Sequence, residues 1–122
     1  REIRSLGEYC VVPLIRYVQS PISQKEPGRR ASAMRIVADL APSILIGELL
    51  PLLRDDSSEV RFQAARSLLR LTGESQGRSP AAWREPVTDS EETIASWTEW
   101  WQQNRGRYPT FKSPTKASPS EN

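Results

Sequence analysis

The sequence predicts an all-α protein: a short right-handed α-solenoid of stacked antiparallel helix pairs, with a C-terminal capping helix and an irregular tail. Apolar residues recur at helical spacing from residue 1 to about residue 72, and no useful run alternates with the period of two of a strand. Proline and glycine fall mostly between these segments. Two helical segments also align with each other at a fixed offset, which is typical of a repeat architecture.

The internal repeat is clearest between residues 33–40 and 64–71, which align at an offset of 31 and match Ala33 to Ala64 and Leu40 to Leu71. The segment VVPLIR at 11–16 resembles LLPLLR at 49–54, at an offset of 38. Each helix pair in such an array leaves an apolar face open, and the next pair covers it. The repeat therefore explains why the apolar faces are too wide for a single neighbour.

The first part of the chain is expected to form a helix pair over 2–9 and 11–19, with Pro13 early in the second helix. Residues 20–28 are a loop by composition, and a helix is expected from about Arg29 to Ala41. Within that helix Arg35 and Asp39 are four residues apart and can pair. We expect Arg30 to be a solvated residue at the helix start.

The second part begins with a helix over 44–54, in which Pro51 is expected to produce a kink or leave a carbonyl unpaired. Asp56 and Glu59 fit a capping box for the next helix, which is expected to end at Gly73. Residues 74–87 are polar and read as a long loop. A last helix is expected over 90–104, where Thr88 and Asp89 are further capping candidates.

The pattern LLPLLRDDSSEVRFQAARSLLRLTG at 49–73 resembles the HEAT-repeat family, and the resemblance covers residues 1–73. The Trp-rich segment 71–105 is similar to the terminal part of bacterial HEAT-repeat proteins. The resemblance implies that Asp55 and Asp56 cap helices and that Arg61 bridges neighbouring repeats. We expect residues 1–105 to form the repeats with their capping helix, residues 106–122 to be disordered or extended, and the whole to be a fragment of a longer protein.

Composition argues against most enzyme classes. The chain has 122 residues and no histidine, which excludes histidine-based zinc sites and catalytic triads. Cys10 is the single cysteine, so no internal disulfide can form, and its setting predicts a small buried hydrophobe. No apolar run is long enough for a membrane span. We expect no catalytic residue, no metal site and no cofactor.

Charge separates the body from the tail. Residues 1–104 carry 13 basic and 14 acidic side chains, and the four other basic residues lie in 105–122. A nucleic-acid-binding body would show a basic patch or stripe, so this distribution disfavours a nucleic-acid partner. The mixed charge favours a protein or peptide.

Four tryptophans have two interpretations, a stacking platform for bases or sugars and a hydrophobic cap on the open end of the array. We expect Trp97 and Trp101 to belong to a cap, whereas Trp100 is the better candidate for an exposed contact. These tryptophans are Trp83, Trp97, Trp100 and Trp101.

The function expected from this architecture is a non-catalytic protein-interaction scaffold, which binds a protein or peptide on the concave face formed by the second helix of each pair. The alternatives are an accessory or C-terminal structural domain of a larger enzyme and a nucleic-acid-binding HEAT-like domain. A single unpaired cysteine is compatible with a reducing, cytoplasmic compartment. The candidate surface consists of Arg16, Glu48, Pro51, Arg54, Asp55 and Trp100.

Overall fold

The protein is all-helical in the computed structural model, which describes residues 2–85 and 90–108, with side chains over 10–85 and 91–108. None of the helices within these residues is both long and apolar enough to cross a membrane. The α-helices are α1 (Glu2–Val18), α2 (Pro27–Leu40), α3 (Ile46–Leu49), α4 (Ser58–Thr72) and α5 (Ser90–Asn104). The 3-10 helices are η1 (Pro21–Lys25), η2 (Ser43–Leu45), η3 (Leu50–Arg54), η4 (Pro80–Arg84) and η5 (Arg105–Arg107).

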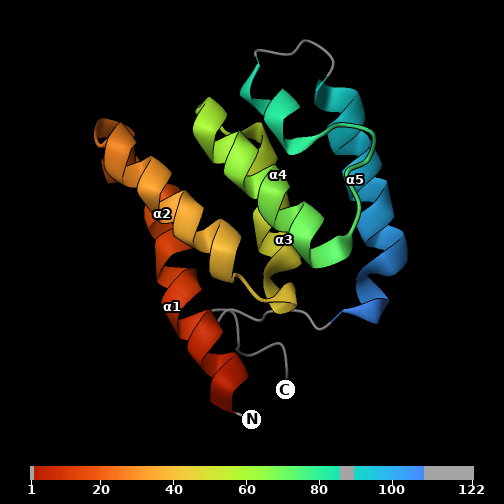
Figure 1. Ribbon diagram of the computed structural model, residues 1–122, viewed down its shortest axis with the longest axis horizontal. Coiled ribbons are helices and arrows are strands. Elements are labelled where there is room, and N and C mark those ends of the chain that lie inside the picture. The colour runs from red at the N-terminus through yellow and green to blue at the C-terminus, as the bar shows by residue number, and fades with distance from the viewer. Residues whose placement is uncertain (1, 86–89, 109–122) are drawn as a thin grey trace, which may run out of the picture.

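Helices α2 and α4 run side by side in the same direction, and α1 and α3 lie behind them in the view of Figure 1. The side chain of Arg70, near the end of α4, donates to the carbonyls of Ala38 and Ala41 at the end of α2. The two helices are therefore parallel neighbours. The core lies between the two layers; its largest fully buried side chains are Trp83, Trp97, Met34, Leu45, Ile46, Leu49, Leu53 and Leu68.

Helix α1 is one continuous helix, so the expected helix pair over 2–9 and 11–19 is wrong. Pro13 lies inside it and cannot donate a hydrogen bond to the carbonyl four residues earlier. Because Pro13 is exposed, water can bond to that carbonyl in place of an amide. The apolar side chains on the other side hold the helix together, since Val11, Ile15 and Val18 are buried in the core.

The segment expected as one helix over 44–54 consists of three short elements, η2, α3 and η3, and Pro51 lies at the change from α3 to η3. The α-helix ends at Leu49, and Pro51 lies in the first turn of the 3-10 helix that follows. A proline needs no amide partner in that first turn, and the tighter winding avoids an interrupted α-helix. The predicted disturbance at Pro51 is therefore confirmed, as a change of helix type.

Helix α4 ends as predicted but is capped by a different residue. Gly73 has a φ of 76°, in the left-handed region, and its amide bonds to the carbonyl of Leu69. At the start, the side chain of Ser57 accepts the amide of Val60 at 3.3 Å, so Ser57 and not Asp56 is the cap. The Asp55 carboxylate accepts the amide of Ser57 at 2.9 Å.

The predicted loop over 74–87 contains η4, which buries Trp83 completely against the core. The expected caps at Thr88 and Asp89 lie outside the described residues, as does the tail from residue 109. Helix α5 covers the remaining end of the core through Ile94 and Trp97, which are both buried. This part of the fold is therefore held by aromatic burial more than by local sequence pattern.

Candidate functional site

Arg30 carries the one charged side chain that is buried in the described part of the chain. Its side chain is 4% exposed, although the sequence predicted a solvated residue there. It forms two hydrogen bonds to the Asp55 carboxylate, at 2.7 and 2.5 Å, which raise the pKa of Arg30 further above its ordinary value. Its Nε donates to the Val18 carbonyl and the Ser23 hydroxyl, and Nη2 donates to the Val18 carbonyl as well. Arg30 thus joins the end of α1 to the turn before α4.

Arg61 makes an analogous set of contacts one helix further along the chain. Its guanidinium donates to the backbone carbonyls of Asp55 at 2.9 Å, Asp56 at 3.1 Å and Trp83 at 3.0 Å. Arg61 therefore ties the end of η3 to the end of η4.

Glu59 and Arg84 form a partly exposed ion pair that fixes η4 against α4. The Arg84 guanidinium contacts the Glu59 carboxylate at 3.1 and 3.2 Å and lies 3.7 Å from the centre of the Phe62 ring. The hydrogen bond from Arg84 lowers the pKa of Glu59 below its ordinary value of 4.5. The ion pair therefore links η4 to the first turn of α4.

Four of the six candidate surface residues are exposed and lie on α1 and the α3–η3 segment. Pro51 and Arg54 are three residues apart in η3, a spacing that lines up side chains along a 3-10 helix, and Glu48 is exposed three residues earlier, in α3. Helix α1 repeats the arrangement, because Pro13 and Arg16 are exposed as well. We call these exposed residues the proline–arginine stripes; they comprise Pro13 and Arg16 on α1 and Glu48, Pro51 and Arg54 on α3–η3.

The two segments bury and expose matching positions. At the offset of 38, Val11 and Leu49 are both buried, and so are Ile15 and Leu53. The prolines and arginines between and after them are exposed in both segments. The likeness between VVPLIR and LLPLLR in the sequence therefore corresponds to a likeness in packing.

The other two candidates, Asp55 and Trp100, make contacts within the protein. Asp55 is 12% exposed, and its carboxylate is occupied by Arg30. Trp100 is half-buried against the core. Arg54 remains exposed and pairs with Glu91 of α5 at 2.8 Å. The structure thus keeps Arg16, Glu48, Pro51 and Arg54 open to solvent and assigns Asp55 and Trp100 to internal packing.

The tryptophans pack against each other and the core. Trp83 and Trp97 are fully buried, so neither presents a face on which a base or sugar could stack. Trp100 meets Trp97 edge to face at 5.6 Å, and its ring lies 6.4 Å from that of Trp101 and 6.0 Å from that of Tyr108. These contacts are those of a hydrophobic cluster that closes one end of the core.

Cys10 is exposed, so the prediction of a small buried hydrophobe is wrong. It occupies the position on α1 that matches Glu48 on α3 at the offset of 38, and both positions face solvent. The misassignment arose because cysteine is usually buried as a residue type, whereas this position belongs to the exposed side of the helix.

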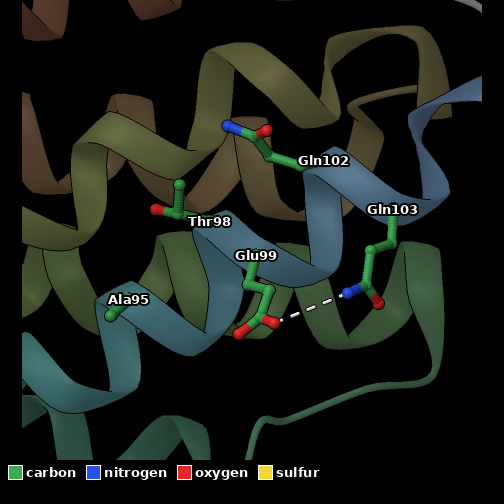
Figure 2. A pocket seen from close by; sticks show the side chains of 5 residues that line it. All are labelled: Ala95, Thr98, Glu99, Gln102 and Gln103. Carbon is green, nitrogen blue, oxygen red and sulfur yellow. Dashed lines mark hydrogen bonds between the residues drawn. The ribbon is translucent and has the colours of Figure 1, made fainter.

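A shallow depression lies on the outer side of α5 and is lined by Ala95, Thr98, Glu99, Gln102 and Gln103, all from that one helix (Figure 2). The Gln103 amide bonds to the Glu99 carboxylate at 3.5 Å, and the Thr98 hydroxyl bonds to a backbone carbonyl. Glu99 is the one titratable group in the lining, so the depression offers no acid–base pair. Over 2–85 and 90–108, no three metal-binding side chains gather into a group that could hold an ion.

Comparison with known proteins gives no match, whether to protein-family models, curated proteins or solved structures. The site must therefore be judged by its own geometry.

Sequence reasoning missed Arg30, although one signal could have found it. The offset of 31 that aligns the two helices also places Arg30 on Arg61, each as the fourth residue of its helix.

Proposed function

We propose that this chain is a non-catalytic protein-interaction module built as a short α-solenoid of the HEAT type. In this proposal α2 and α4 are neighbouring helices of one layer, α2 packs against α1, and α4 packs against η3 and η4. The observation that carries the proposal is the matched burial of 11–16 and 49–54, because two equivalent helices of the back layer then present the same exposed residues.

The proline–arginine stripes supply the contact surface. Arg16 and Arg54 recur at equivalent positions, and Glu48 adds an acidic group on the second helix. Exposed proline rings offer rigid apolar contacts that lose little side-chain entropy on binding. A protein or peptide segment with both acidic and basic residues has the chemistry to match this surface.

The basic groups of the body favour a protein partner over a polyanion. Arg30 and Arg61 are committed to internal carbonyls and Asp55, whereas Arg66 and Arg84 pair with the acidic side chains of Asp39 and Glu59. Guanidinium groups that are neutralised within the protein add little to the attraction for phosphate. A separate role as a structural domain of a larger enzyme is compatible with the same fold.

A charge exchange on the stripe tests this function. The immobilised chain and its Glu48→Arg/Arg54→Glu variant are used to capture partners from a lysate of the source cells. The matched control is Lys25→Glu/Glu74→Arg, which exchanges two exposed charges on η1 and beyond the end of α4. The proposal predicts that the stripe variant loses a partner that the control retains. Equal recovery by both variants would exclude this surface.

A further inference from the structure

The exposed flank of α2 carries an inference about a second binding surface, and the inference rests on the repeat architecture proposed above. Helices α2 and α4 are compared at the offset of 31. Their positions facing the core agree, since Ala33 and Ala64 are both buried, and so are Val37 and Leu68. The burial of the two helices differs most along one flank; on the other side Ala38 is buried against α4, whereas the equivalent Leu69 is 37% exposed.

That flank is defined by positions 29, 32, 36 and 40 of α2 and positions 60, 63, 67 and 71 of α4. With 3.6 residues per turn, these positions fall on one flank of each helix. On α4 the flank is covered: Gln63 is 4% exposed and Ser67 is fully buried. On α2 the equivalent flank is open, and Ile36 and Leu40 are 43% and 56% exposed.

Helix α2 itself covers the flank of α4. The two helices are neighbours, and Arg66 of α4 pairs with Asp39 of α2 at 2.8 Å. In Figure 1, α2 is the outermost helix of its layer. A further helix that packed on this open flank would therefore contact α2 in the same way as α2 contacts α4.

The terminal unit of a repeat array carries a polar outer face, because it must remain soluble without a neighbour. Two large aliphatic side chains one turn apart do not make such a face. The opposite end of the protein is closed, since Trp83 and Trp97 are buried under η4 and α5. The flank carries the exposed polar residues Arg29 and Ser32 in its first half and the aliphatic pair Ile36 and Leu40 in its second half, and this aliphatic half is the contact surface.

We propose that the α2 flank binds one amphipathic α-helix that runs parallel to α2 and carries a carboxylate in its last turn. The carboxylate follows from the charges. The residue equivalent to Arg66 is Arg35, which is exposed on α2. Asp39 forms an ion pair with Arg66, so an acidic residue at the equivalent position of the bound helix would form an ion pair with Arg35.

The probe is a synthetic peptide of residues 26–44. This peptide contains α2, which is the helix that packs on the equivalent flank of α4. A lactam between positions 32 and 36 holds it helical, and circular dichroism verifies its helicity. Both positions lie on the peptide flank that faces away from the contact. The peptide is titrated into the isotope-labelled full chain and followed by amide chemical shifts.

The proposal predicts saturable shifts centred on residues 29–40 of the chain. Binding should become at least about tenfold weaker, or about 1.4 kcal/mol, in the Ile36→Glu/Leu40→Glu chain. A charge exchange gives the sharper control: Arg35→Asp in the chain weakens binding, and Asp39→Arg in the peptide restores it. All four of these positions are exposed, so these variants should fold.

Three results would overturn the proposal: no shift from a helical peptide, shifts centred elsewhere, or equal affinity in the Ile36→Glu/Leu40→Glu chain. Self-association of the chain that this variant abolishes would also overturn it, since the flank would then bind a second copy. The Glu48→Arg/Arg54→Glu chain should bind the peptide normally. A peptide that does not bind would therefore overturn only the proposal for the α2 flank. Equal partner recovery by the stripe variant and its control would exclude only the stripes as a binding surface.

Discussion

Arg30 and Arg61 lie 31 residues apart and occupy the same place on two parallel helices, and each donates to a backbone carbonyl at the C-terminal end of an earlier helix. For Arg30 that carbonyl belongs to Val18, the last residue of α1. For Arg61 it belongs to Asp55, the residue after η3. Asp55 also receives Arg30 on its carboxylate, so one residue connects both arginines.

Removal of Arg61 should lower the free energy of unfolding by about 2 kcal/mol, because Arg61→Ala leaves partly buried carbonyls without donors. The comparison is Arg29→Ala, which removes an exposed ion pair with Glu26 and should cost less than about 1 kcal/mol. Urea unfolding monitored by circular dichroism measures both. Equal losses in the two variants would argue against the bridging role of Arg61.

The two glycines Gly73 and Gly28 should respond to alanine in opposite directions. Gly73 has a positive φ, so Gly73→Ala forces a left-handed conformation on an L side chain and should destabilise the protein by about 1 kcal/mol. Gly28 lies in the first turn of α2 with open space around it, so Gly28→Ala should stabilise by about 0.5 kcal/mol. Thermal unfolding of the two variants checks the signs, and a loss for Gly28→Ala would contradict the assigned start of α2.

The Glu59–Arg84 pair should contribute to stability at neutral pH and lose that contribution in acid. The pKa of Glu59 is lowered in the folded state, so the contribution is complete above the ordinary value of 4.5 and disappears as pH falls through the folded pKa. Glu59→Gln should therefore reduce the decline of stability below pH 4.5. Urea unfolding at a series of pH values measures how the free energy of unfolding declines in acid, with Glu92→Gln on α5 as the control. An unchanged decline in Glu59→Gln would exclude the pair as a source of acid sensitivity.

Cys10 should react in the folded protein. Its thiol is exposed on α1, so a disulfide reagent should modify it at a rate close to that in the urea-unfolded chain. Absorbance of the released thiolate follows the reaction. Modification that waits for unfolding would place Cys10 in the core and would contradict the exposed side of α1.

The sequence was sufficient to predict the helices whose apolar residues recur at helical spacing. The segments α2 and α4 were predicted to within two residues at their starts and one at their ends. The break at residue 10 was wrong because an exposed proline interrupts one hydrogen bond without ending a helix whose other side is buried. The segment around Trp83 was missed because its order comes from burial of one indole, which has no local periodicity.

The candidate surface was predictable where it depends on local spacing and unpredictable where it depends on distant partners. The exposed positions Glu48, Pro51 and Arg54 follow from a spacing of three. The environment of Arg30 does not, because its partners are 12 and 25 residues away in the chain. For the same reason Asp39 was expected to pair with Arg35 on its own helix, whereas it pairs with Arg66 across the α2–α4 contact.

The central structural claim is that Arg30 joins α1, α2 and the turn before α4 into one stack. A double-mutant cycle with Arg30→Met and Asp55→Asn measures this joint through the free energy of unfolding, with Arg29→Met, whose side chain is 75% exposed, as the control. Arg30→Met should cost about 3 kcal/mol and the pair should couple by at least about 2 kcal/mol, since one buried charge loses its partner. A coupling below about 0.5 kcal/mol, or a loss no greater than that of Arg29→Met, would contradict the account.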